Sequence, residues 1–239
     1  MTSQLYYHDA YTKQFEATIE EVQEEKLIIL NQTAFYPSGG GQPSDIGTLT
    51  SNGEIFIVNH VGKKDGKIIH EVAKHGLKKG DKISGEINWN KRYKLMRMHT
   101  AAHVIAAIMH QKASALITGN QLDEEVSRID FSLENFNREQ IEQYIEDANQ
   151  YIRKNLHVSS YFISIEEARN IPELSRLAAF NINKIATNNQ IRIVEIEGLD
   201  KQADGGTHVK SLKEIGKIFL DRLENKGSKN RRLYFKLED

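Results

Sequence analysis

The spacing of apolar residues changes near residue 89, and this change divides the chain into two kinds of structure. Before it, the sequence consists of short runs of β-favouring residues. These runs cover residues 15–22, 26–33, 47–50, 54–60, 67–73 and 82–89. Asn52-Gly53 and Asp65-Gly66 separate successive runs and are dipeptides that accept positive φ in tight hairpins. The N-terminal part is therefore predicted to form a small β-barrel or curled sheet.

From Asn90 onward, apolar residues such as Leu95, Met98 and Ala102 recur at steps of three and four. This period predicts a helix, and its second half is apolar nearly all round, which indicates burial. Further strands and one amphipathic helix follow, with a central strand over 191–199 that leads into the turn in the run DGGTH and an amphipathic segment over 212–223. We predict an α+β fold made of a β-rich glycine-motif domain, residues 1–88, and an α+β domain, residues 89–239.

The composition limits the chemistry that the chain can carry. It contains no cysteine, so thiolate ligands are excluded and any metal must be held by nitrogen and oxygen. The formal net charge of −1 gives no overall basic field for nucleic acid. There is no signal-like N-terminus and no run of 18 apolar residues, so we expect a cytoplasmic protein without a membrane partner.

Two distant motifs could share one metal ion. His99 and His103 in the run HTAAH project from the same helix face, four residues apart. A lone pair of this kind is more often a satisfied core or surface pair, which is the alternative here. Asp204 and His208 in the run DGGTH add an oxygen and a nitrogen, and zinc is the likeliest ion for such a set.

Each of the two predicted domains contains a glycine-rich segment. Gly205, Gly206 and Thr207 form a predicted turn that aims Asp204 and His208 at one point. Nearer the N-terminus stand Gly39, Gly40, Gly41 and Gln42. This second stretch matches neither a Walker A loop nor a dinucleotide fingerprint, so ATP is not expected. It is either a tight turn between strands or a backbone-lined wall of a pocket.

The C-terminal region bunches four basic residues. They are Lys226, Lys229, Arg231 and Arg232. Such a patch can hold a phosphate backbone, and a solvated loop is the alternative. Thr100 stands where His-Glu-x-x-His hydrolases have the glutamate that acts as general base, so the motif favours labile esters over amides.

Several motifs in one order resemble a known family. HTAAH, DGGTHV, AFYPSGGGQPSDIG, SRIDFS and ENKGSKNRRLYF together resemble the editing domain of alanyl-tRNA synthetases and the freestanding alanyl-tRNA editing proteins. The resemblance covers most of the chain and points to the longer freestanding members, which carry an N-terminal β domain. It implies a second domain similar to the editing domain of threonyl- and alanyl-tRNA synthetases.

The resemblance also implies an activity and a set of residues. The expected reaction is hydrolysis, in trans, of serine or glycine from the acceptor end of mischarged tRNA(Ala) at a zinc site. Carried over, His99, His103 and His208 are zinc ligands. The family usually has cysteine where this chain has Asp204, which could ligate zinc or orient water. Asp204, Thr118 and Gln42 are the candidate catalytic residues, with the Thr118 hydroxyl expected to recognise serine.

Two other functions are compatible with these motifs. One is a zinc hydrolase of small esters, which would not explain the basic C-terminal patch. The other is a zinc-containing tRNA-binding module without catalysis, in which the metal only ties the fold together. The oligomeric state does not follow from the sequence.

Overall fold

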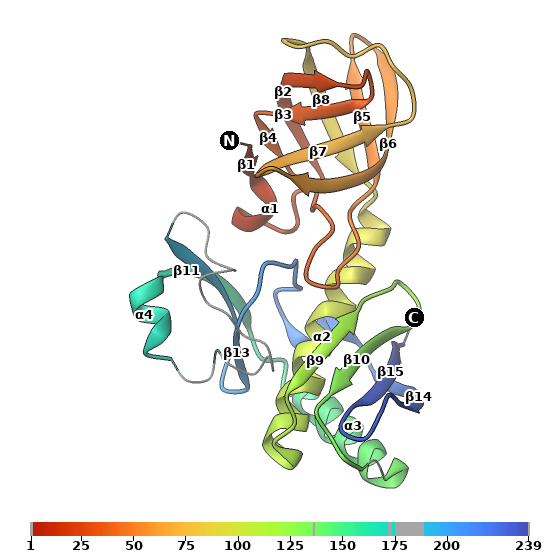
Figure 1. Cartoon of the computed structure of the whole chain (residues 1–239), viewed down its shortest axis with the longest axis vertical. Coiled ribbons are helices and arrows are strands. Elements are labelled where there is room, and N and C mark those ends of the chain that lie inside the picture. Colours follow the sequence, from red (N-terminus) through yellow and green to blue (C-terminus); the bar gives the residue numbers. More distant parts are fainter. Residues whose placement is uncertain (1, 136, 172–173, 175–188, 239) are drawn as a thin grey trace. The chain divides into compact units, whose positions relative to one another are not determined.

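The computed structural model describes residues 2–135, 137–171, 174 and 189–238, and the chain divides into two compact units. These are Met1–Leu95 and Met96–Asp239 (Figure 1). Helix α2, Trp89–Ala113, begins in the first unit and ends in the second. The division of functional domains between residues 88 and 89 stays a prediction.

The first unit contains the predicted barrel. Its six strands are β2 (Gln14–Gln23), β3 (Leu27–Leu30), β5 (Gly47–Ser51), β6 (Glu54–Lys64), β7 (Lys67–Val72) and β8 (Lys82–Ile87). They close in the order β2-β3-β7-β6-β5-β8 with antiparallel neighbours. The short elements β1 (Ser3–Gln4), α1 (Leu5–His8) and β4 (Gln32–Thr33) accompany them. Asn52 and Asp65 have φ of 49° and 52°, as the hairpin prediction requires.

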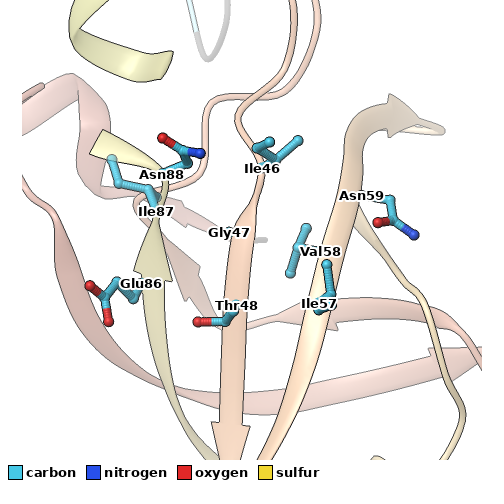
Figure 2. A pocket seen from close by; sticks show the side chains of 9 residues that line it. All are labelled: Ile46, Gly47, Thr48, Ile57, Val58, Asn59, Glu86, Ile87 and Asn88. Atoms are coloured by element: carbon cyan, nitrogen blue, oxygen red, sulfur yellow. The ribbon is translucent and has the colours of Figure 1, made fainter. Parts of the chain in front are cut away.

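An open pocket of about 590 Å³ lies on the barrel where β5, β6 and β8 run side by side (Figure 2). Ile57 and Ile87 line it, and Gly47 lies between them. A Cβ atom at Gly47 would lie 2.1 Å from the carbonyl oxygen of Glu86, so glycine is required for β5 to approach β8.

A fully buried ion pair holds the glycine-rich segment to the start of α2. The guanidinium of Arg92 donates to both carboxylate oxygens of Asp45 and to the carbonyl oxygens of Ala10 and Ala34. Asp45 in turn accepts the N–H of Tyr36 at 2.6 Å. Because every partner is satisfied, the buried charges are compensated, and loss of either one would leave the other uncompensated.

The glycine motif itself is a tight turn. Gly39 and Gln42 exchange backbone hydrogen bonds of 3.1 and 2.9 Å, and Gly40 and Gly41 between them have φ of 60° and 86°. Glycine adopts positive φ values at lower cost than other residues, which suits Gly40 and Gly41 to this turn. The turn interpretation is confirmed, and a pocket wall formed by its backbone stays a prediction.

The second unit combines two antiparallel sheets with helices. One sheet has the order β14-β15-β10-β9 and the other the order β11-β12-β13. The strands are β9 (Ile117–Gln121), β10 (Ser127–Phe131), β11 (Val158–Ser164), β12 (Gln190–Ile196), β13 (Asp200–Ala203), β14 (Ile218–Asn225) and β15 (Arg231–Leu237). In the part of this unit that the structure describes, the helices besides α2 include α3 (Arg138–Arg153), α4 (Ile165–Arg169) and the 3-10 helix η2 (Leu212–Ile215). The predicted α+β class is confirmed.

Two local expectations need correction. The strand over 191–199 does not lead directly into the DGGTH turn, because the chain reverses after β12 and β13 intervenes. The amphipathic segment over 212–223 is two elements, η2 and the start of β14. Gly216 has φ of 75° and ends η2, which explains the break. Among the residues described above, no helix is long and apolar enough to cross a membrane.

The barrel contains a buried histidine that makes its stability depend on pH. Burial lowers the pKa of His70 from 6.5 to about 4, against the smaller opposing effect of its hydrogen bond to the carbonyl of Ile28. In the unfolded chain the His70 imidazole is therefore protonated below about pH 6.5, whereas in the folded chain it is protonated only below about pH 4. We expect the free energy of unfolding to fall by up to about 3 kcal/mol as pH drops through this window.

Urea unfolding between pH 7 and pH 4.5, followed by the fluorescence of Trp89, measures this effect, because Trp89 packs against the barrel core. His70→Gln is the comparison, since glutamine does not titrate and carboxylates contribute equally to both proteins. Equal pH slopes for the two proteins would contradict the prediction.

Candidate metal centre

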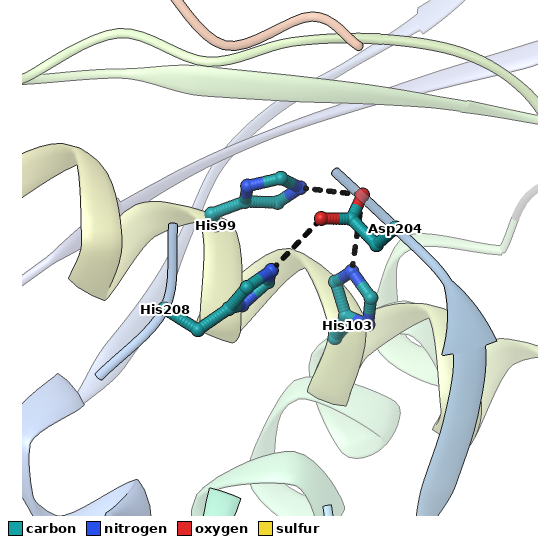
Figure 3. Close-up of side chains that lie close together, drawn as sticks. All are labelled: His99, His103, Asp204 and His208. Carbon is teal, nitrogen blue, oxygen red and sulfur yellow. Dashed lines mark hydrogen bonds and ion pairs between the residues drawn. The ribbon is translucent and has the colours of Figure 1, made fainter. Parts of the chain in front are cut away.

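The structure brings the two metal-binding motifs together (Figure 3). His99 and His103 extend from one face of α2, whereas Asp204 and His208 come from the turn that follows β13. The three imidazole centroids lie 4.3 to 5.3 Å apart. One ligand atom from each of the four side chains lies within 4.8 Å of the others. The convergence expected from the sequence is therefore present in the fold.

The Asp204 carboxylate lies among the three imidazoles, as the dashed lines in Figure 3 show. Its Oδ1 atom is 3.1 Å from His208 Nε2, and its Oδ2 atom is 3.4 Å from His99 Nε2 and 3.9 Å from His103 Nε2. Two bonds of about 2.0 Å at a tetrahedral zinc separate their ligand atoms by about 3.3 Å. The nitrogen and oxygen donors are of the kind that zinc accepts, and the distances from Asp204 to His208 and His99 are close to this separation.

Residues outside the ligand set contact two of the imidazoles and orient them. His103 Nδ1 donates to the buried carboxylate of Asp200 at 2.9 Å. His208 Nδ1 lies 3.2 Å from the hydroxyl oxygen of Thr100, and that hydroxyl donates to the carbonyl of Met96. These two contacts orient both rings so that their Nε2 atoms point to the common centre.

The turn that carries Asp204 is held rigidly. The N–H of Gly206 donates to Asp204 Oδ1 at 2.6 Å, which fixes the carboxylate against its own backbone. Arg192 on β12 donates through Nη1 to the carbonyl oxygens of Asp204 and Gly206, at 3.0 and 2.9 Å. The N–H of Val209 donates to Thr100 Oγ1, which joins the end of the turn to α2.

The protonation states suit metal binding. Burial alone would raise the pKa of Asp204, but the charge of His99 and the hydrogen bond with His208 hold it well below its ordinary value. Burial, together with the charge of His99, lowers the pKa of His208 well below its ordinary value. A carboxylate and a neutral imidazole are the forms that coordinate a metal.

Comparisons with known proteins agree with this geometry. The family model for class II (A) tRNA synthetases matches residues 4–91, and the one for the second additional domain of threonyl and alanyl tRNA synthetases matches residues 191–234. The chain is 47% identical to the alanyl-tRNA editing protein AlaX-M of Methanosarcina mazei, over 100% of this chain and 98% of that protein. It is 42% identical to the AlaX-M protein of Saccharolobus solfataricus, over 98% of each.

The chain belongs to the AlaX-M family of alanyl-tRNA editing proteins. It is also 35% identical to the alanine–tRNA ligase of Methanosphaera stadtmanae, where it matches only 26% of the ligase. The resemblance inferred from separate motifs is therefore confirmed over the whole length of the chain.

Other predicted site residues of this AlaX-M protein lie outside the metal group. Gly39, Gly40, Gly41 and Gln42 belong to the barrel unit, and the roles predicted for them stay predictions. Thr118 is exposed on β9, and its hydroxyl donates to the side chain of Asn230 at 2.8 Å. Its predicted recognition of serine likewise stays a prediction.

The basic C-terminal residues differ in what they contact. Arg231 is 8% exposed and donates to the carbonyl oxygens of Gly227 and Glu134. Arg232 forms a bidentate pair with Asp130 at 2.7 and 2.9 Å. Lys226 Nζ lies 3.0 Å from Glu224 Oε2. The side chain of Lys229 is 80% exposed. Binding of phosphate through this patch stays a prediction, and the two arginines have internal partners.

Sequence reasoning did not identify the outer residues of the centre. Asp200 and Gln202 lie on β13 and Asp204 directly follows it, and this alternate spacing places Asp200 and Gln202 on one face of the strand. Gln202 Nε2 donates to Asp200 Oδ2 at 2.8 Å. This alternation of polar residues was the available signal. No sequence signal marked the roles of Thr100 and Arg192, because these roles arise only from contacts with other segments of the chain.

We expect Asp200→Asn to weaken zinc binding by about 10- to 100-fold, because the amide cannot orient His103 as the carboxylate does. Competition with a chromophoric chelator measures the affinity, and thermal unfolding of the metal-free protein tests the fold. Asp221→Asn on β14 is the matched control and should bind zinc as the parent does. Unchanged zinc affinity in Asp200→Asn would refute the role given to Asp200.

Proposed function

We propose that this protein hydrolyses the ester bond of mischarged tRNA(Ala) in trans, releasing serine and also glycine. The observation that carries the proposal is the convergence of three imidazoles and one carboxylate from segments about a hundred residues apart. Membership of the AlaX-M family supports tRNA as the substrate, because the relatives are named alanyl-tRNA editing proteins. The cytoplasm, where tRNA is charged, is the proposed location.

We propose zinc as the metal, held by His99, His103, His208 and Asp204. Zinc accepts such nitrogen and oxygen ligands at tetrahedral spacing, and the absence of cysteine leaves no thiolate alternative. When bound, zinc supplies Lewis acidity toward an ester carbonyl and lowers the pKa of water. The role of the chain is to hold Asp204 as an ionised carboxylate and His208 as a neutral imidazole, the forms that coordinate a metal.

The two oxygens of Asp204 have different tasks in this proposal. Oδ1 is held by the N–H of Gly206, so it orients the carboxylate. Oδ2 faces His99 and His103 and is the atom that completes the ligand set. A carboxylate is less tightly bound to zinc than a thiolate, so Asp204 can also accept a proton from the attacking water.

Residues outside the metal group complete the proposed substrate site. The turn residues Gly205, Gly206 and Thr207 shape the amino-acid pocket beside Asp204. Thr118 distinguishes serine from alanine through its hydroxyl, which now bonds to Asn230. The remaining proposed contacts with tRNA are Gly39, Gly40, Gly41, Gln42, Lys226, Lys229, Arg231 and Arg232.

The test is deacylation of seryl- and alanyl-tRNA(Ala) by protein with and without its metal. Serine release should be faster than alanine release, fall at least about 100-fold after chelation, and return with zinc. His99→Ala should not recover with zinc, whereas His157→Ala, which alters an exposed histidine, should behave as the parent does. Serine release no faster than the spontaneous rate would refute the proposal.

Substitution of Asp204 separates its two tasks. Asp204→Ala should lower zinc affinity at least about tenfold, because one ligand is lost. Asp204→Cys should keep zinc, because a thiolate is an excellent zinc ligand and the family usually has cysteine at this position, and its deacylase activity relative to that of the parent measures what the carboxylate contributes as a proton acceptor. Zinc content and single-turnover deacylation measure both effects. Full zinc affinity in Asp204→Ala would show that Asp204 is not a ligand.

A further inference from the structure

A cluster of three aromatic side chains at the start of α2 is not used by the metal chemistry. It consists of Tyr11, Trp89 and Tyr93, all in the Met1–Leu95 unit and all partly exposed. Trp89 stacks on Tyr93, with ring centroids 5.5 Å apart and planes inclined by 26°. The ring centroid of Tyr11 lies 5.5 Å from that of Trp89 and 6.5 Å from that of Tyr93. We refer to these three residues as the aromatic cluster.

A lysine covers part of the cluster. Lys13 is exposed, and its Nζ atom lies 4.6 Å from the centroid of the Trp89 ring. A cation above an exposed ring is held weakly, whereas a nucleobase stacked on an aromatic ring makes the stronger contact. A base could therefore displace the ammonium group from the ring face and leave it beside the phosphate that follows the base.

The charges near the cluster favour a polyanion. The sequence has no aspartate or glutamate between Glu86 and Asp123, whereas Lys91 and Lys94 follow Trp89 within two turns of the helix. The positive end of the helix dipole lies at the same place. Carboxylates also lie nearby: Asp9 accepts the backbone N–H of Tyr11 at 3.2 Å, and the exposed Glu86 pairs in register with Gln14, next to Lys13.

We propose that the aromatic cluster is a stacking platform for unpaired bases of RNA. Aromatic rings next to lysines are the usual means of binding single strands, whereas a duplex hides the faces of its bases. This inference rests on the proposed function, under which the bound strand is the single-stranded 3′ end of the tRNA. That end must be held while its terminal ester is hydrolysed.

The chain offers a direct probe of this contact, because Trp89 is its one tryptophan. The full-length protein is titrated with a short single-stranded RNA that ends in CCA, and with the same RNA annealed to its complement. Stacking should quench the Trp89 fluorescence in a saturable way with the single strand and not with the duplex. No quenching, or equal quenching by the two RNAs, would overturn the proposal.

Variants extend the test to affinity, measured by the fluorescence anisotropy of labelled RNA. Trp89→Leu should raise the Kd for the single strand at least about fivefold, whereas Trp89→Phe, which keeps an aromatic face, should restore most of the binding. Tyr11→Leu serves as a second variant if Trp89→Leu does not fold. Phe162→Leu removes an exposed aromatic side chain from β11 and is the matched control. Equal affinities for the parent and the folded cluster variants would overturn the platform.

Deacylation assays of the same proteins separate this inference from the proposed function. The cluster variants should raise KM for seryl-tRNA(Ala) and leave kcat and zinc content unchanged. Deacylation by a parent protein whose Trp89 fluorescence does not respond to RNA would refute the platform alone. Quenching without deacylation would refute the proposed function and leave the platform standing.

Discussion

The metal centre depends on one buried hydroxyl that joins two segments 109 residues apart. Thr100 Oγ1 accepts the N–H of Val209 and lies 3.2 Å from Nδ1 of His208, so it fastens the DGGTH turn to the helix that carries His99 and His103. A buried polar group is costly unless it is bonded, and this hydroxyl satisfies its neighbours on both sides. The position that holds the general-base glutamate in His-Glu-x-x-His hydrolases thus has an architectural role here.

Around that junction the polar groups form layers. The inner layer is the set of three Nε2 atoms and the Asp204 carboxylate. The outer layer is Asp200 on His103, Thr100 on His208 and Arg192 on the backbone of the turn. Since His103, His208 and the Asp204 turn are each held by an outer group, most of the site is oriented by contacts within the protein.

The barrel unit uses the same principle with different groups. Arg92 and Asp45 are buried and fully bonded, and they attach the glycine turn to the start of α2. The aromatic cluster begins three residues before Arg92, at Trp89, on the part of the helix that remains partly exposed. The first turns of α2 thus present a buried face that is structural and an exposed face that is suited to nucleic acid.

The sequence by itself determined the local elements and the chemistry of the ligands. Periodicity of apolar residues and positive-φ dipeptides depend on positions a few residues apart, so the barrel strands, α2 and the hairpin turns were predictable. The lack of cysteine limited the ligands to nitrogen and oxygen. Only the tertiary structure revealed the role of Asp200, the internal partners of Arg231 and Arg232, and the intervening strand β13. The contacts of Asp200 with His103, of Arg231 with Glu134 and of Arg232 with Asp130 join residues about a hundred positions apart. No local pattern encodes which distant groups a fold will place in contact.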